Sequence, residues 1–349
     1  MEKRKLGTTD IEVTSICLGT MNWGNGQCDE RDAHEQLDYA VAHGVNFIDT
    51  AEVYPIPPKL ETQGLTETYV GNWLKKRGKR DDLVIASKVS GLNQAGSIRE
   101  RDAGVGLTRD AIRTAIEGSL RRLKTDYLDL YQVHVPDRKV NNFGLRNYAE
   151  DYGFEGAAIE ETLSALSELV KEGRVRALGI SNETPWGMME YLRIAREKGH
   201  TKIATIQNQY SLLNRTYEIG LSEVGFREGV SLLAYSPLSM GALTGKYLHG
   251  VRPEGARHVL FVRNEDRYNP PRAQAVIERY VELAKKYDTA PSTFAIAFTV
   301  NQPCVTSSII GATTMAQLKE DIDGGEFVWT PEMSADVADV YNDHPDPVA

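Results

Sequence analysis

The chain has 349 residues, with 40 lysines and arginines against 49 aspartates and glutamates, so its formal charge is −9 at pH 7. This acidic balance, without a long run of Lys or Arg, argues against binding to nucleic acid or another polyanion. The charged N-terminus lacks the apolar core of a signal peptide, and no apolar stretch approaches the ~18 residues of a membrane span. We therefore expect a cytoplasmic protein that binds neither nucleic acid nor membrane.

The three cysteines, Cys17, Cys28 and Cys304, form no C-x-x-C pair. Neither a disulfide framework nor a thiolate metal site is expected, and no metal ion is predicted. At this length one α/β barrel is as plausible as two ordinary domains, so the pattern of elements has to decide.

Short apolar runs with strand character recur along the whole chain. The opening segments Lys3–Gly7 and Glu12–Ser15 are expected to form a hairpin that turns between them. Eight strand candidates follow: Ile16–Gly19, Asn46–Asp49, Leu83–Lys88, Leu128–His134, Arg176–Ile180, Ile203–Gln207, Val230–Tyr235 and Val305–Ile310. Eight strands close a barrel, so residues 1–349 are predicted to form one α/β domain, a (β/α)8 or TIM barrel.

Helical spacing of apolar residues fills most of the gaps between these strands. The predicted helices are Arg31–His43, Thr66–Arg77, Thr108–Leu123, Glu160–Glu172, Pro185–Lys198 and Met315–Asp323. Thr108 and the run Ser181–Glu183 have the character of helix starts. Two consecutive helices, Arg272–Tyr287 and Thr293–Asn301, precede the last strand, and we interpret the first as an addition to the barrel.

Two long irregular stretches, Val135–Ala157 and Ser236–Asn269, follow the fourth and seventh predicted strands. Long loops in a compact domain usually serve function, and loops after strands lie on the catalytic face of a barrel. We therefore expect both stretches to border a site.

Polar side chains gather at the carboxyl ends of the predicted strands, which converge on one face of a barrel. They are Asp49 with Tyr54 just beyond it, Lys88, His134, Ser181, Asn182, Gln207, Asn208, Tyr235, Ser236 and Thr313. Taken singly, each has a more ordinary interpretation as a turn residue, a solvated strand end, a buried imidazole or a packed ring. An acid, a phenol, an amine and an imidazole from three successive strands are better explained together as a site.

These four groups suit the reduction of a carbonyl, in which the oxygen takes up a proton as hydride reaches the carbon. A free phenol has a pKa of ~10, so Tyr54 needs a nearby cation to release its proton, and Lys88 can be that cation. Asp49 would keep Lys88 charged, and His134 would hydrogen-bond the carbonyl oxygen. General acid catalysis is typically worth ~10²–10⁴-fold, so a bound hydride donor is also required.

The run Asn46–Tyr54, with Lys88 in Ile85–Val89 and His134 in Asp129–His134, resembles the aldo-keto reductase superfamily. Glu61–Trp73 and Gln207–Arg215 resemble its bacterial Tas-type, NADP(H)-dependent subgroup. The similarity covers nearly the whole chain. It implies an NADPH-dependent enzyme that reduces a small-molecule aldehyde or ketone to an alcohol, as a monomer or weak homo-oligomer.

The resemblance also implies roles for individual residues. The catalytic tetrad would be Asp49, Tyr54, Lys88 and His134, with Tyr54 as general acid and base. Around the nicotinamide end of the cofactor would lie Gly19, Thr20, Met21, Asp49, Ser181, Asn182, Gln207 and the stacking ring of Tyr235. The pyrophosphate would be surrounded by Ser236, Pro237, Leu238, Gly241 and Leu243, and the 2′-phosphate would meet Lys246 and Arg263. The adenosine would contact Gly311, Thr313, Gln317, Glu320 and Asp321.

Several of these assignments have alternatives. Arg257 and Arg267 share a loop with Arg263 and can replace it, and Asp321 stands where many relatives carry Asn, which leaves the adenine contacts open. Residues 104–106 lack the third glycine and the preceding strand of a Rossmann fingerprint. The substrate pocket is assigned to Trp23, Tyr54 and His134. Further candidates at its mouth are Trp73, Trp186 and the 141–152 loop, although packing is the commoner role of aromatic side chains.

Two other functions are compatible with these residues. One is a cofactor-binding regulatory or redox-sensing subunit on the same fold, as in potassium-channel beta subunits, and the complete tetrad argues against it. The other is a lyase in which Lys88 forms a Schiff base, because barrels also host aldolases.

Overall fold

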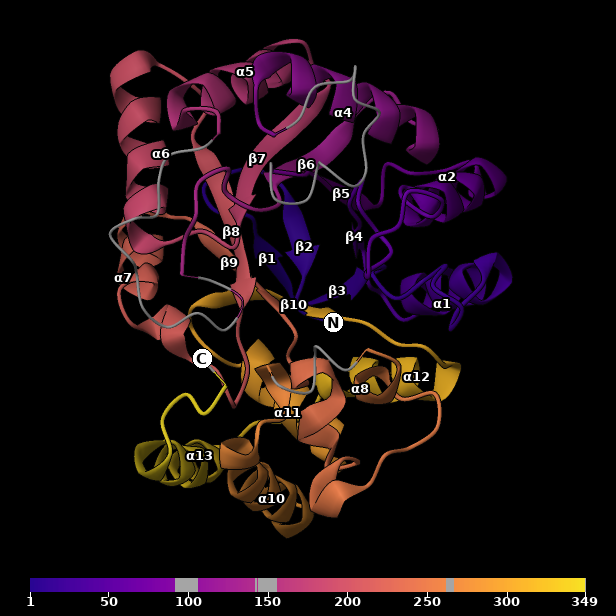
Figure 1. Ribbon diagram of the computed structural model, residues 1–349, viewed down its shortest axis with the longest axis vertical. Coiled ribbons are helices and arrows are strands. Elements are labelled where there is room, and N and C mark those ends of the chain that lie inside the picture. Colours follow the sequence, from indigo (N-terminus) through magenta and orange to yellow (C-terminus); the bar gives the residue numbers. More distant parts are fainter. Residues whose placement is uncertain (92–105, 142, 144–155, 262–266, 349) are drawn as a thin grey trace.

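The computed structural model describes residues 1–91, 106–141, 143, 156–261 and 267–348. Two short strands, β1 (Lys3–Lys5) and β2 (Glu12–Thr14), pair antiparallel as the predicted hairpin. The other eight form a closed parallel barrel in the order β10-β3-β4-β5-β6-β7-β8-β9 (Figure 1). The predicted (β/α)8 barrel with an N-terminal hairpin is therefore confirmed.

The barrel strands lie where the apolar runs predicted them, with ends that differ by one or two residues. They are β3 (Ile16–Gly19), β4 (Phe47–Asp49), β5 (Val84–Val89), β6 (Leu128–Val133), β7 (Val175–Ser181), β8 (Ile203–Gln209), β9 (Ser231–Tyr235) and β10 (Val305–Ile310). Nearly all their residues are buried, as parallel strands covered by helices require.

The long helices surround the strands (Figure 1). They are α1 (Glu30–Ala42), α2 (Leu65–Arg77), α4 (Arg109–Leu123), α5 (Ile159–Lys171), α6 (Pro185–Lys198), α7 (Leu221–Glu228), α10 (Pro271–Lys286), α11 (Pro291–Val300), α12 (Met315–Gly324) and α13 (Pro331–Asp343). Shorter helical elements are the 3-10 helices η2 (Thr216–Glu218), η3 (Ser239–Thr244) and η4 (Leu248–Gly250) and the four-residue α-helix α8 (Arg257–Leu260). No helix among the described residues is long and apolar enough to cross a membrane.

Local capping explains several helix starts. Asp29 and Asp32 form a reciprocal capping box at α1, and Thr108 accepts from Ala111 N at α4. The start expected at Ser181–Glu183 is wrong, because Ser181 ends β7 and the N-cap of α6 is Thr184, followed by Pro185.

Among the described helices of eight or more residues, α7 and α13 are absent from the sequence prediction. Helix α7 has only eight residues, between Gly220 and Gly229, so the segment is too short for its helical periodicity to be detected. In contrast, α13 begins at Thr330 and Pro331, a clear N-cap signal that was overlooked. It packs on α10, which confirms that α10 is an addition outside the barrel (Figure 1).

The interior of the barrel has an apolar layer and a polar layer. Because side chains alternate along a strand, Phe47 and Asp49 point inward, as do Leu130 and Gln132 on β6. The lower layer, with Phe47 and Leu130, is closed by Leu6, Ile11 and Val13 of the hairpin region. The polar layer therefore faces the opposite end, where the strands end.

Candidate active site

Four buried groups meet at the carboxyl ends of β4, β5 and β6. Asp49 ends β4, Lys88 lies on β5 and His134 follows β6, while Tyr54 lies in the loop after β4. Lys88 is fully enclosed, Asp49 is 1 % exposed, and Tyr54 and His134 are each 7 % exposed. The structure therefore brings together all four residues of the predicted tetrad.

Lys88 lies at the centre of this group. Its Nζ donates to Asp49 Oδ2 (2.5 Å), to the carbonyl oxygen of Thr50 (2.8 Å) and to the hydroxyl of Tyr54 (3.3 Å). The rings of Tyr54 and His134 meet edge to face, with centroids 5.4 Å apart. Lys88 thus links the carboxylate of Asp49 to the phenol of Tyr54, and the imidazole of His134 packs against that phenol.

The charges follow from this geometry. Against the lowering effect of burial, Asp49 and the Tyr54 oxygen raise the pKa of Lys88 above its usual value, so it stays an ammonium. Burial raises the pKa of Tyr54, and Lys88 opposes that effect without reversing it. Burial, with help from Lys88, holds the pKa of His134 well below its usual range. At neutral pH Lys88 is therefore an ammonium, Tyr54 a protonated phenol and His134 a neutral imidazole.

Two glutamines hold the carboxylate in place. Gln132 and Gln207 each donate an amide N–H to Asp49 Oδ1, at 3.1 and 2.9 Å. Gln207 was predicted from the sequence as a cofactor residue, whereas Gln132 was missed. The signal for Gln132 was its position two residues before His134, which places both on the inner face of the barrel.

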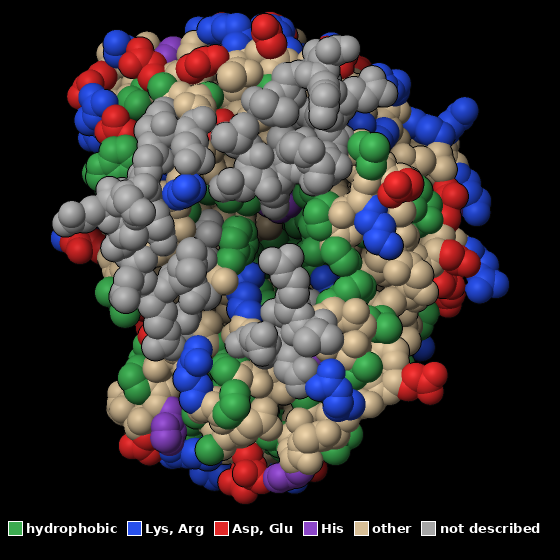
Figure 2. Space-filling view, viewed as in Figure 1, with side chains coloured by type: hydrophobic (Ala, Val, Ile, Leu, Met, Phe, Trp, Pro, Cys, Tyr) green, Lys and Arg blue, Asp and Glu red, His purple; other side chains and the backbone are tan. Residues whose placement is uncertain are grey.

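A cavity of about 910 Å³ opens above the tetrad. It is lined by Asp49, Tyr54 and His134 and by residues from the ends of β3, β7, β8, β9 and β10. Figure 2 shows it as a hollow in this face of the molecule. Most predicted cofactor residues line it: Gly19, Met21, Asp49, Ser181, Asn182, Gln207, Tyr235, Ser236, Pro237, Leu238, Gly241, Lys246, Gly311, Thr313, Gln317, Glu320 and Asp321.

Beside the tetrad, hydrogen bonds join the strand-end residues. The Tyr235 hydroxyl donates to Asn182 Oδ1 (2.7 Å), and Asn182 Nδ2 donates to the backbone oxygen of His134 (2.9 Å). Ser181 Oγ donates to the Gln207 carbonyl oxygen (2.7 Å). These bonds fix the side chains of β7, β8 and β9 relative to the tetrad.

The loop after β9 approaches the cavity with its backbone. Ser236, Met240 and Gly241 have φ values of 57°, 54° and 91°, in the left-handed region. Lys246 follows and is half-buried. Burial lowers the pKa of Lys246, while the nearby Asp321 opposes this effect. The loop thus presents backbone in left-handed conformations and one cation, Lys246, to the cavity.

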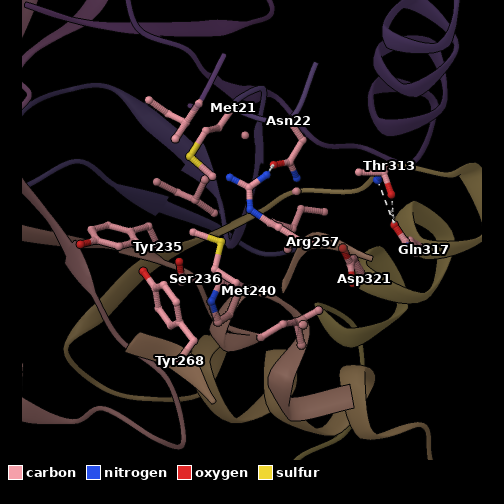
Figure 3. A pocket seen from close by; sticks show the side chains of 18 of the residues that line it. Met21, Asn22, Tyr235, Ser236, Met240, Arg257, Tyr268, Thr313, Gln317 and Asp321 are labelled. Carbon is pink, nitrogen blue, oxygen red and sulfur yellow. Dashed lines mark hydrogen bonds between the residues drawn. The ribbon is translucent and has the colours of Figure 1, made fainter. Parts of the chain in front are cut away.

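Two arginines of the 252–267 loop also line the cavity. Arg257 Nη1 donates to Asn22 Oδ1 (2.6 Å), and its buried Nε has no partner within the described ranges. Arg267 Nη2 donates to Gln209 Oε1 (2.6 Å) on the side of Tyr235. Figure 3 shows Arg257 reaching across toward Asn22. Arg263, the residue chosen from the sequence, lies outside the described residues, as do residues 104–105 and most of the 141–152 loop.

The far end of the cavity is formed by α12 and the turn before it. Gln317 Oε1 accepts from the backbone N–H and the hydroxyl of Thr313, at 2.9 and 3.0 Å (Figure 3). Asp321 is 3 % exposed. Burial raises the pKa of its carboxyl group well above the usual range, Glu320 adds to the increase and Lys246 opposes it.

Some predicted residues do not reach this cavity. Trp23 is fully buried in the core and donates to Gln36 Oε1, so assigning it to the substrate pocket is wrong. Trp73 is likewise packed and bonded to Asp38. Thr20 and Leu243 lie beneath the cavity wall rather than on it, whereas Trp186 is exposed on α6. Trp23 and Trp73 thus pack in the core instead of lining the site.

Several lining residues were not singled out from the sequence. They include Asn22, Met240, Pro253–Ala256 and Tyr268, whereas Phe143, which also lines the cavity, belongs to the 141–152 loop predicted at its mouth. Most lie in loops without a periodic pattern, so only the fold brings them to the cavity. Among the described residues, no group of three His, Cys, Asp or Glu side chains is placed to hold a metal ion.

Comparison with known proteins agrees with this geometry. Residues 15–342 match the model of the aldo/keto reductase family. The chain belongs to the aldo/keto reductase family. It is 48 % identical to "Protein tas" of Escherichia coli over 345 residues, 98 % of each chain. It is also 31 % identical to "Uncharacterized oxidoreductase YrpG" of Bacillus subtilis, over 98 % of this chain and 96 % of that one.

A third relative concerns the cofactor. The chain is 31 % identical to the "NADH-specific methylglyoxal reductase" of Escherichia coli, over 92 % of this chain and 93 % of that protein. Family membership confirms the predicted resemblance and makes the protein an oxidoreductase of the carbonyl-reducing class. The name of this relative specifies NADH, so family membership alone does not decide between NADPH and NADH.

Proposed function

We propose that the protein is an NADPH-dependent reductase of aldehydes or ketones, acting in the cytoplasm with Tyr54 as general acid and base. The observation that carries the proposal is the position of Lys88 Nζ, between Asp49 Oδ2 and the Tyr54 hydroxyl at the floor of the cavity. A phenol beside a buried ammonium can give up its proton because the cation stabilises the phenolate left behind.

The cavity fits a phosphorylated dinucleotide. Its walls offer curled backbone at Ser236 and Gly241 for close approach to phosphates, and two cations, Lys246 and Arg257, that no described carboxylate pairs within 4.0 Å. We assign the 2′-phosphate to Lys246 and the diphosphate to Arg257 with the Ser236–Gly241 loop. The adenosine would lie against Gln317, Glu320 and Asp321, and the nicotinamide against Tyr235, Asn182, Ser181 and Gln207.

Bound NADPH supplies the hydride for the substrate carbon. Tyr54 donates its proton to the carbonyl oxygen, and Lys88, held charged by Asp49, stabilises the phenolate. His134 is neutral and its Nδ1 has no hydrogen-bond partner among the described residues, so the imidazole can hydrogen-bond the carbonyl oxygen and orient the substrate. In the reverse direction the same phenolate accepts the alcohol proton.

The geometry argues against the Schiff-base alternative. A nucleophilic lysine must be neutral and reach the substrate. Lys88 is fully buried, makes three hydrogen bonds through Nζ, and has a raised pKa. It therefore acts as a fixed cation and not as a nucleophile.

The test is Tyr54→Phe, which keeps the ring and removes the proton. We expect carbonyl reduction to fall by ~10²-fold or more while NADPH affinity stays nearly unchanged. Steady-state rates with an aldehyde panel and fluorescence titration with NADPH measure the two quantities separately. Reduction at an undiminished rate would show that Tyr54 is not the proton donor.

A further inference from the structure

The end of the cavity beside the tetrad contains a cation that the proposed mechanism does not use. Arg267 Nη2 donates to Gln209 Oε1 at 2.6 Å and lies 3.5 Å from the Tyr235 hydroxyl. Its guanidinium carbon lies 5.0 Å from the ring centre of Phe143 and 4.6 Å from that of Tyr268. Through Tyr235 and Asn182 it is connected to the backbone of His134. These contacts hold the charge close to the reacting groups.

Arg267 has no counter-ion among the residues that the structure describes. Its hydrogen-bond partners are an amide and a phenol, and no carboxylate among the described residues lies within 4.0 Å of it. Among the described residues, its buried Nε has no acceptor and its Nη1 donates to none. A poorly solvated cation without an anionic partner is costly, so a ligand is the natural source of the missing charge.

The cofactor is unsuited to be that ligand at this position. Its phosphates are assigned to Lys246, near Asp321, and to Arg257, near Asn22. Arg267 instead contacts Tyr235, which faces the nicotinamide in the proposed function. That ring is neutral when reduced and positive when oxidised, so a cation beside it does not strengthen cofactor binding. The anion must then come from the substrate.

We propose that Arg267 binds a carboxylate of the carbonyl substrate, so that the enzyme prefers aldehydes or ketones that carry one. This inference rests on the proposed function. A guanidinium presents planar, charged N–H donors that match a carboxylate. Tyr268 lines the same cavity, and its buried hydroxyl, which has no hydrogen-bond partner in the described part of the chain, offers a further donor. Figure 3 shows the Tyr268 ring standing beside Tyr235.

The experiment compares two aldehydes, 4-formylbenzoate and its methyl ester, which share the aldehyde and the ring but differ in charge and by one methyl group. We expect the unmodified enzyme to show a kcat/KM at least tenfold higher for the carboxylate. In Arg267→Gln this ratio should fall at least tenfold, chiefly through a higher KM for the carboxylate, and Arg267→Lys should restore part of it. A matched control is Arg279→Gln, on the outer surface of α10 and paired with Asp343, which should keep the original ratio.

The outcomes separate the inference from the proposed function. Equal kcat/KM values for the acid and the ester, or a ratio that survives in Arg267→Gln, overturn the role of Arg267 and leave the reductase proposal intact. A ratio that falls equally in the Arg279 control also overturns it. Failure to reduce either aldehyde, together with an absence of NADPH binding, overturns the proposed function itself and this inference with it.

Discussion

Asp321 places a carboxyl group in the cavity wall, where no described residue donates a hydrogen bond to its side chain. Burial raises its pKa well above the usual range, Glu320 adds to this, and Lys246 opposes it. The folded protein therefore keeps a proton on Asp321 at pH values where the unfolded chain, with a pKa of ~3.9, has lost it. Stability contributed by this group is largest in acid and falls as the pH rises toward the folded pKa.

Replacing Asp321 by Asn should remove this pH dependence. Because each unit of pKa shift corresponds to about 1.4 kcal/mol, Asp321→Asn should stabilise the cofactor-free protein, and its advantage should be larger at pH 8 than at pH 5. Thermal unfolding of both proteins across this pH range measures the difference. An advantage that does not change with pH would show that Asp321 is not protonated in the folded state.

At the residue scale, the sequence predicted the chemistry better than it predicted the contacts. The tetrad was recognisable because acid, phenol, amine and imidazole follow successive strands. The choice among Arg257, Arg263 and Arg267 could not be made, because a loop without periodicity does not show which side chains turn inward. Trp23 was misassigned for a similar reason, since its burial depends on α1 and not on its neighbours in the chain.

At the scale of elements, helix α2 packs very closely on the end of α4. A Cβ built on Gly71 would lie 2.1 Å from the backbone oxygen of Arg122 and 2.7 Å from the carbonyl carbon of Leu123. Beside this contact, the enclosed Glu67 accepts from Arg122 Nε (2.6 Å) and from Ser87 Oγ (2.5 Å). The two helices and β5 are thus joined by a glycine contact and a buried ion pair.

Gly71→Ala should separate these helices. The gain in helix propensity is about 1 kcal/mol, but the methyl group meets backbone that cannot rotate away, so we expect a net loss of roughly 1–3 kcal/mol. Denaturant unfolding measures this free energy. Lys76→Ala, at an exposed position on the same helix, is the control and should change stability by less than about 0.5 kcal/mol. Equal stability of Gly71→Ala and the parent would contradict the close contact.

The strands and helices themselves explain why most of the fold was predictable. Runs such as Val305–Ile310 are short and apolar because both faces of a parallel strand are covered, and such runs recur eight times. The short helix α7 was missed because eight residues give barely two turns. The long loop after β9 gave no sign of its turns, since Met240 adopts a left-handed conformation that its residue type does not announce.

For the whole molecule, the cavity joins parts of the chain that are far apart in sequence. Its lining includes Gly19 after β3, Ser236 after β9, Ile296 of α11 and Asp321 of α12. Of the helices added outside the barrel, α10 packs against α11 and α13 packs against α10 (Figure 1). A dinucleotide in this cavity would contact both the barrel and the C-terminal helices, and so would stabilise the molecule as one unit.

Unfolding in the presence of cofactor tests this expectation. A ligand at 100 times its Kd stabilises the folded state by about 2.7 kcal/mol, which corresponds to roughly 5 °C in Tm for a protein of this size. Since Lys246 has no acidic partner within 4.0 Å among the described residues, we expect NADPH to give a larger shift than NADH at equal concentration. A single domain should also show one transition with and without cofactor.

The variant Lys246→Met tests whether Lys246 causes the difference between the Tm shifts given by NADPH and NADH. The variant should lose most of the extra shift given by NADPH and keep the shift given by NADH, because only the 2′-phosphate distinguishes them. Lys285→Met, at an exposed position near the end of α10, is the matched control and should retain the full difference. Equal shifts for NADPH and NADH in the unmodified protein would contradict the phosphate role of Lys246. Two separate unfolding transitions would contradict the prediction of a single domain, because they would show that the barrel and the C-terminal helices unfold independently.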